Sequence, residues 1–120
     1  MKLESRKLLL DALEACEAIT RHLSSLAFSD YRDNRLLRHS VEREFEIIGE
    51  ALNRLSRIDS DTAAGISELR RVVDFRNRIV HGYDTVDDEA VWAIAQSYLK
   101  VLLRELQSLL DSTKPPNSTN

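Results

Sequence analysis

The feature that most constrains the fold of this chain is the lack of strong helix breakers along almost its whole length. The 120 residues include only three glycines, and both prolines, Pro115 and Pro116, lie in the tail. An all-β fold needs turn residues roughly every 8–12 positions, so the composition argues against one. Hydrophobic residues make up 42% of the chain, enough for a packed core and too many for a disordered protein. We expect one helical domain.

Apolar residues recur at steps of three and four along four segments, which is the spacing of one face of an α-helix. The predicted helices cover residues 3–26, 30–57, 66–81 and about 88–112, with a loop or a short helical turn near 60–65. Each apolar stripe can be buried only against another helix, so the sequence predicts an all-α, up-and-down bundle of four main helices. Residues 1–112 are expected to form this domain, followed by a disordered polar tail at 113–120.

Single residues suggest where helices end or meet. Asp30 is an N-cap candidate, Gly82 is expected just past the end of the third helix, and Thr85 with Asp88 resembles a capping box. Gly49 lies beside the apolar stripe of the second helix, where a missing side chain would let another helix approach closely. A helix glycine that is merely tolerated is the alternative.

Other features exclude whole classes of protein. Cys16 is the only cysteine, so neither an internal disulfide nor a cysteine-based zinc site is expected, and its place in an apolar stripe predicts a packed core thiol. The three histidines fall on three different predicted helices, and we expect no metal and no cofactor. No apolar run approaches the roughly 20 residues of a membrane span, and the first residues do not resemble a signal peptide. The expected location is the cytoplasm, away from membranes.

One short segment departs from the acidic character of the chain. Residues 70–83 contain four arginines and one acidic residue, Asp74, so this segment carries +3 while the whole chain carries −3. A basic segment in an acidic chain suggests an anionic ligand. A solvated helix face with an Asp74–Arg78 pair is the alternative reading.

The position of Arg76 is the most informative detail of that segment. On a helical projection it falls near the middle of an apolar arc, where an unpaired guanidinium is costly to bury. One reading is that its stem packs while its charged end reaches solvent. The other is that Arg76 lines a cleft. We expect Arg76 to line a cleft, with Ile66, Leu69, Val73 and Val80 buried beside it.

Polar residues follow Arg76 within one short stretch. Asn77 and His81 share a helix face, and Tyr83 lies two residues beyond His81. The C-terminal end of a helix favours a protonated imidazole, which suits proton transfer near neutral pH. Taken singly, His81 could be a cap, Asn77 a polar boundary residue and Tyr83 an edge residue of the bundle.

Together these residues resemble a known family. The stretch from Arg76 to Tyr83 reads Arg-Asn-x3-His-x-Tyr, the Arg-x4-His-x-Tyr motif of the HEPN superfamily, and more narrowly of the HepT toxins of HepT–MNT toxin–antitoxin systems. Supporting matches are Ile-Gly-Glu-Ala at 48–51, the Leu69-Arg70-Arg71 run, and Val91-Trp92 after an acidic turn. The resemblance covers about residues 5–110.

The resemblance implies a function and partners. It implies a homodimeric, metal-independent RNase with Arg76 and His81 as catalytic residues and with the two motif segments facing each other across the dimer. Asn77, Arg78 and Arg71 would support catalysis or bind RNA phosphates. A minimal nucleotidyltransferase (MNT) antitoxin would transfer AMP onto Tyr83 and silence the toxin. Two other readings remain open: a non-catalytic HEPN module that binds a nucleotide or supports a nucleotidyltransferase, and a purely structural dimerisation bundle.

Overall fold

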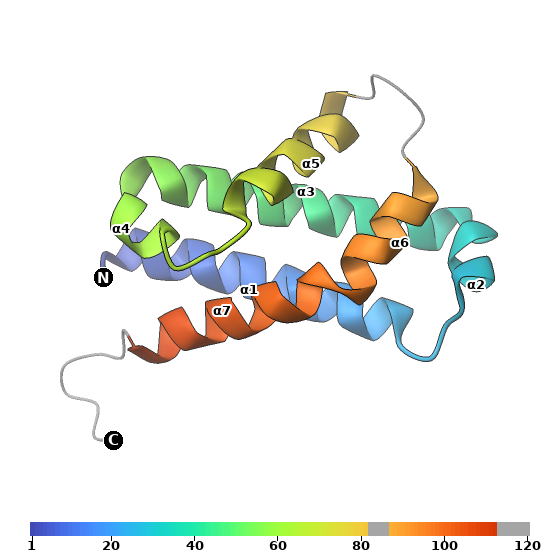
Figure 1. Cartoon of the computed structure of the whole chain (residues 1–120), viewed down its shortest axis with the longest axis horizontal. Coiled ribbons are helices and arrows are strands. Elements are labelled where there is room, and N and C mark those ends of the chain that lie inside the picture. Colours follow the sequence, from blue (N-terminus) through green and yellow to red (C-terminus); the bar gives the residue numbers. More distant parts are fainter. Residues whose placement is uncertain (82–86, 113–120) are drawn as a thin grey trace.

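The computed structural model describes residues 1–81 and 87–112 of the chain. These residues form seven α-helices, shown in Figure 1. Four long or paired segments build the body: α1 (Leu3–Leu23), α3 (Arg35–Ile58), α5 (Leu69–His81) and the consecutive α6 (Asp88–Gln96) and α7 (Tyr98–Ser112). Two short helices, α2 (Phe28–Arg32) and α4 (Ser60–Ala63), lie at the turns on either side of α3.

The main helices alternate in direction around the bundle. In Figure 1, α1 and α3 lie side by side, α7 packs against α1, and α5 crosses α3 at an angle. This arrangement confirms the predicted all-α bundle of four main helices, and α4 is the short helical turn expected near 60–65. The predicted tail at 113–120 lies outside the described residues.

The predicted apolar stripes form one continuous core. Cys16 is fully buried inside it, as predicted, and burial raises the pKa of its thiol to about 12. In the predicted helices at 3–26, 30–57 and about 88–112, four residues of the apolar stripes are only partly buried: Leu13, Leu37, Tyr98 and Leu109. The stripe residues that are buried are Leu9, Cys16, Ile19, Leu23, Val41, Phe45, Ile48, Leu52, Leu55, Val91, Ala95, Leu102 and Leu106.

The predicted first and second helices end differently from the expectation. The first ends at Leu23 rather than near residue 26, because Ser25 adopts a positive φ of 65° that a right-handed helix cannot contain. The second is divided into α2 and α3. Asn34 breaks it by capping α3, since its side-chain oxygen accepts a hydrogen bond from the Leu37 backbone N–H at 3.0 Å. Asp30 is therefore inside α2 and is not the N-cap.

The predicted fourth helix is also two helices. Ser97 separates α6 from α7, and its hydroxyl donates to the Ala93 carbonyl at 2.7 Å, a back-bond that tends to bend a helix. The N-cap of α6 is Asp87, whose carboxylate accepts from the backbone N–H groups of Glu89 and Ala90. Gly82 and Thr85, which we expected at the adjoining helix ends, lie outside the described residues.

The predicted third helix begins at Leu69 instead of near residue 66. Ile66 is buried before the helix starts, and the Glu105 carboxylate of α7 accepts a hydrogen bond from the Ser67 N–H at 3.1 Å. Leu69 is only partly buried and Val73 is buried as expected. Val80 is 44% exposed, so its predicted burial is wrong. The reason is that α5 diverges from α3 toward its C-terminal end, so that its last turn stands clear of α3 (Figure 1).

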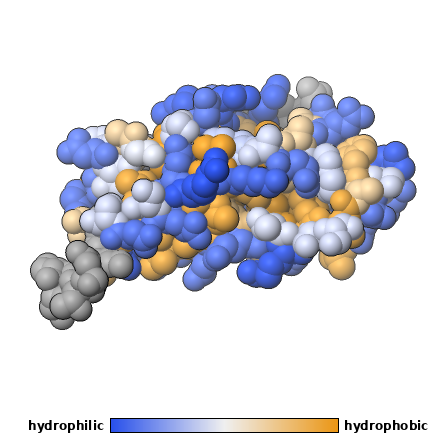
Figure 2. Space-filling view, turned by 60° about the horizontal axis from the view of Figure 1, so that its bottom comes forward, coloured by the Kyte–Doolittle hydropathy of each residue, from blue (hydrophilic) through white to orange (hydrophobic). Residues whose placement is uncertain are grey.

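The surface is mixed in character. On the face shown in Figure 2, hydrophilic side chains cover most of the molecule, and hydrophobic ones appear in the spaces between them. Within residues 1–81 and 87–112, no helix has both the length and the apolar character needed to cross a bilayer.

Candidate functional site

All the described residues of the predicted site lie on α5. Arg71, Arg76, Asn77, Arg78 and His81 project from this one helix, which rests mainly on α3. Tyr83, the predicted modification site, lies outside the described residues. The geometry of the site is therefore decided by how α5 is placed on α3.

The two helices approach each other closely at Gly49. A Cβ atom at this position would lie 2.2 Å from Cβ of Arg76 and 2.6 Å from its Cγ. Gly49 is buried, and only a residue without a side chain fits there. The predicted role of Gly49 in a close helix contact is confirmed, and its partner is the arginine that disrupts the apolar arc.

This contact explains how Arg76 occupies an apolar face. Its aliphatic stem lies over Gly49, and the residue as a whole is half-buried. Its Nη1 donates a hydrogen bond to Oδ1 of Asn77 at 3.0 Å. Its Nε is buried, and among the described residues no acceptor reaches it. A buried donor without an acceptor is rare in folded proteins, and a functional role is one of its explanations.

Asn77 has a partner that we did not expect. The resemblance implied that Asn77 supports catalysis or binds an RNA phosphate, whereas its side-chain oxygen accepts from the guanidinium of Arg76. The bond joins two neighbouring residues and restricts the rotation of the guanidinium. Asn77 therefore acts on the arginine in this structure.

His81 is the last residue of α5 and is exposed. It lies five positions after Arg76, so the two side chains leave the helix about 140° apart and about 7.5 Å apart along its axis. Arg76 lies where α5 is packed on α3, whereas His81 lies on the last turn of α5, which stands clear of α3 (Figure 1). Val80, exposed beside His81, adds an apolar residue to the same end.

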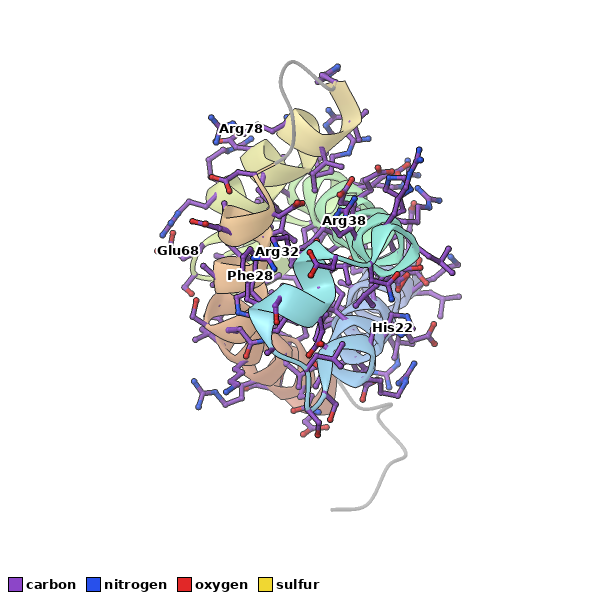
Figure 3. The ribbon with its side chains drawn as sticks, turned by 90° about the vertical axis from the view of Figure 1, so that its right-hand side faces the viewer. His22, Phe28, Arg32, Arg38, Glu68 and Arg78 are labelled. Atoms are coloured by element: carbon purple, nitrogen blue, oxygen red, sulfur yellow. The ribbon has the colours of Figure 1, made fainter. Side chains whose placement is uncertain are left out.

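The two other arginines of the predicted site lie along a different line of α5. Arg71 and Arg78 are seven residues apart, share one face of the helix and are exposed. The Arg71 guanidinium lies 3.6 Å from the Glu68 carboxylate, a surface pair that contributes little to stability. Figure 3 shows Arg78 projecting outward from α5 at the top of the view, while His22 on α1 lies lower and on the other side.

Beside this line, α5 leaves space against the junction of α6 and α7. A cavity of about 150 Å³ lies there, with Phe75, Ile94 and Tyr98 among its lining residues. The Phe75 ring also contacts the Phe45 ring of α3 edge to face, with centroids 5.3 Å apart. Phe75, the neighbour of Arg76, is thus held between α3 and this cavity. No sequence pattern marks Phe75 as a site residue, because an aromatic residue in a helix is usually a core residue.

Two buried hydroxyl groups are unusual in this fold. The hydroxyl oxygens of Tyr31 and Tyr98 are buried, and neither has a hydrogen-bond partner among residues 1–81 and 87–112. Burial raises the pKa of both phenols. Periodicity placed Tyr98 on an apolar stripe, but no local pattern indicates that its hydroxyl lacks a partner.

The histidines do not come together. His22, His39 and His81 lie on α1, α3 and α5, and within the described part of the chain no group of three or more His, Cys, Asp or Glu side chains is placed to hold a metal ion. The chemistry available at the end of α5 is therefore that of an imidazole and several guanidinium groups: proton transfer and the binding of a phosphate.

Comparison with known proteins gives the same family as the motif. The family described as "Ribonuclease HepT-like" matches residues 12–109. A relative named "Probable ribonuclease HepT", from Thermococcus cleftensis, is 27% identical over 111 residues, which cover 91% of this chain and 98% of that protein. Another, "Putative RNase MJ1216" of Methanocaldococcus jannaschii, is 22% identical over 109 residues, which cover 91% and 89%. No solved structure matches the chain. With most of its length matched and the motif on α5, this chain belongs to the HepT-like ribonuclease family.

Proposed function

We propose that this protein is a metal-independent endoribonuclease and the toxin of a toxin–antitoxin pair. The observation that carries the proposal is the arrangement of Arg76. Its stem is packed on Gly49, and its guanidinium is held by Asn77 yet has a buried Nε without an acceptor among the described residues. With its Nε held inside, the guanidinium would bind a phosphate oxygen of RNA through its terminal N–H groups.

The proposed reaction needs three groups. A base removes the proton from the 2′-hydroxyl, an acid protonates the leaving 5′-oxygen, and a cation stabilises the charge that develops on the phosphorane. His81 carries out one proton transfer, and Arg76 supplies the cation. Arg71 and Arg78 hold neighbouring phosphates of the chain.

His81 is the histidine at the end of α5, and a single imidazole cannot be both the base and the acid of the same step. We therefore propose a two-fold homodimer in which His81 of each protomer faces the other. Support comes from the exposed Val80, which would be covered in such an interface, and from the last turn of α5, which stands clear of α3.

Control by the antitoxin would act at Tyr83. A minimal nucleotidyltransferase would transfer AMP from ATP: the Tyr83 oxygen attacks the α-phosphate, pyrophosphate leaves, and the phenol loses its proton. AMP would add bulk and negative charge two residues from His81 and thereby repel an RNA phosphate.

The cleavage test uses purified protein and single-stranded RNA in excess EDTA. We expect the parent protein to cut the RNA and the variants Arg76→Ala and His81→Ala to lose cleavage while remaining folded. His22→Ala removes another exposed helix histidine, far from α5, and should keep full activity. Cleavage that requires a divalent ion, or that survives in His81→Ala, would contradict the proposed mechanism.

The dimer is tested by sedimentation together with activity. We expect Val80→Glu to shift the protein toward monomer and to reduce cleavage, because the charge lies next to His81. Leu10→Glu is the matched control, since Leu10 on α1 is 39% exposed, close to the 44% of Val80. A protein that is monomeric at micromolar concentration and fully active would rule out the dimeric site.

The antitoxin step is tested by intact mass after incubation with the neighbouring nucleotidyltransferase and ATP. Tyr83→Phe should remain toxic and gain no AMP, while the parent protein gains AMP and loses cleavage. Equal AMP addition to both proteins would remove Tyr83 from this role. Binding of a nucleotide without any RNA cleavage would favour the non-catalytic HEPN module instead.

A further inference from the structure

The contact between Gly49 and Arg76 involves the backbone of α3 and the first side-chain atom, Cβ, of Arg76. A Cβ at residue 49 would meet Cβ of Arg76 at 2.2 Å, and that atom is fixed by the backbone of α5. The third neighbour is the Val72 carbonyl oxygen at 3.4 Å, which is also backbone. No change of side-chain rotamer relieves the contact with Cβ of Arg76. A side chain at residue 49 therefore has to push α5 away from α3.

The size of that displacement follows from the distances. Increasing the separation from 2.2 Å to the 3.4 Å of ordinary contact needs a movement of about 1.2 Å. Arg76 would move with the helix, since its own Cβ is the atom in contact. Among the described residues Arg76 forms no salt bridge that could hold it in place. Its position depends on the spacing between the two helices and on the bond to Asn77.

We propose that Gly49 is a positioning residue for Arg76. Because residue 49 has no side chain, α5 packs on α3 at the separation that buries Nε of Arg76 and directs its guanidinium to the phosphate being cleaved. This inference rests on the proposed function, because it takes Arg76 to be the group that binds that phosphate. It adds a residue of α3 to a site whose other described members all lie on α5.

The experiment compares Gly49→Ala with Gly65→Ala. The second variant makes the same chemical change at a position where the new Cβ would meet the end of the Leu109 side chain, 2.8 Å from Cδ2, which can rotate away. Gly65 lies in the turn after α4, outside α5. Alanine at residue 49 raises helix propensity, so a loss in Gly49→Ala cannot come from a weaker helix.

Two measurements are made on each variant. The first is the hydrogen exchange of the Arg76 Nε–H by nuclear magnetic resonance, assigned by its disappearance in Arg76→Lys. We expect protection in the parent and in Gly65→Ala and at least tenfold faster exchange in Gly49→Ala. The second is RNA cleavage. A misplacement of about 1 Å can cost about 100-fold in rate, so kcat of Gly49→Ala should fall by at least tenfold while KM changes much less.

The outcomes separate this inference from the proposed function. If the parent cleaves RNA and Gly49→Ala keeps both kcat and the protected Nε–H, the positioning role is wrong and the ribonuclease proposal stands. If the parent cleaves no RNA, the ribonuclease proposal fails, and the exchange measurement alone decides whether Gly49 positions Arg76.

Gly49→Ala could also fail to fold. In that case the double variant Gly49→Ala/Arg76→Gly is tested. It adds a Cβ at residue 49 of α3 and removes the Cβ at residue 76 of α5, so the contact is relieved. Recovery of the folded state, measured by circular dichroism, would show that the contact sets the spacing of the two helices. Failure to recover would overturn the inference.

Discussion

Replacing Arg76 with methionine should leave the fold as stable as before or make it more stable. Methionine keeps the part of the stem that lies over Gly49 and removes the guanidinium. A buried donor without an acceptor costs about 1–3 kcal/mol, and Nε of Arg76 is such a donor within the described structure. The variant also loses the bond to Asn77, worth about 1–2 kcal/mol at this half-buried position. The balance runs from a loss of about 1 kcal/mol to a gain of about 2 kcal/mol, with its middle slightly on the side of a gain.

The assay is urea unfolding followed by helical circular dichroism, at several protein concentrations because a dimer would couple stability to concentration. In thermal unfolding each kcal/mol corresponds to a shift of about 4 °C for a domain of this size. RNA cleavage by Arg76→Met should be lost in the same preparation. This combination of equal or higher stability with lost activity is typical of a residue kept for function.

Arg38→Met is the matched control. Arg38 also lies half-buried on a helix, but its Nε lies 3.8 Å from the Asp88 carboxylate and its guanidinium donates to the Arg32 carbonyl. Methionine there should lower stability by about 1 kcal/mol. If Arg76→Met lowers stability by more than about 1 kcal/mol, the guanidinium holds the fold together and the reasoning from its buried Nε is refuted.

Three further predictions concern groups outside the site. The Asp59 carboxylate accepts hydrogen bonds from Thr62 and Ser5, which hold its pKa below the usual 3.8. The ionised carboxylate therefore stabilises the folded state above that pH, and this stabilisation is lost as the pH falls through the folded-state pKa. Asp59→Asn should therefore lower the urea midpoint at neutral pH and flatten its decline in acid; an unchanged acid decline would contradict this. Cys16, with no exposed surface and a pKa of about 12, should react with a thiol reagent only as urea unfolds the chain, and rapid reaction of the native protein would show that the core opens. Tyr98→Phe removes a buried hydroxyl that has no partner among the described residues, so urea unfolding should show unchanged or slightly higher stability; a loss above about 1 kcal/mol would reveal a partner for that hydroxyl.

The helix boundaries show how far local patterns reach. Apolar periodicity predicted the core faces of all four main segments, because burial of a stripe depends only on the spacing of residues along one helix. Ser25, Asn34 and Ser97 each end or interrupt a segment that the periodicity continued through. Apolar spacing carries no information on such breaks, which come from a backbone angle or from side-chain bonds to nearby backbone groups.

The start of α5 depends on a residue far along the chain. Glu105 of α7 accepts the hydrogen bond of the Ser67 N–H, and no pattern near residue 67 indicates that partner. In the same way, the exposure of Val80 depends on where α5 diverges from α3 and cannot be read from the apolar arc of α5 itself.

By itself, the sequence determined the helical class, the Arg-x4-His motif on the third main helix and the conflict between Arg76 and its apolar surroundings. Only the tertiary structure decided how that conflict is resolved, by setting Gly49 of α3 against the root of the Arg76 side chain. The physical reason is that the residues of a single helix share a fixed geometry, so their faces can be read from spacing. The point where two helices touch depends on their crossing angle and relative height, which the packing of the whole core determines.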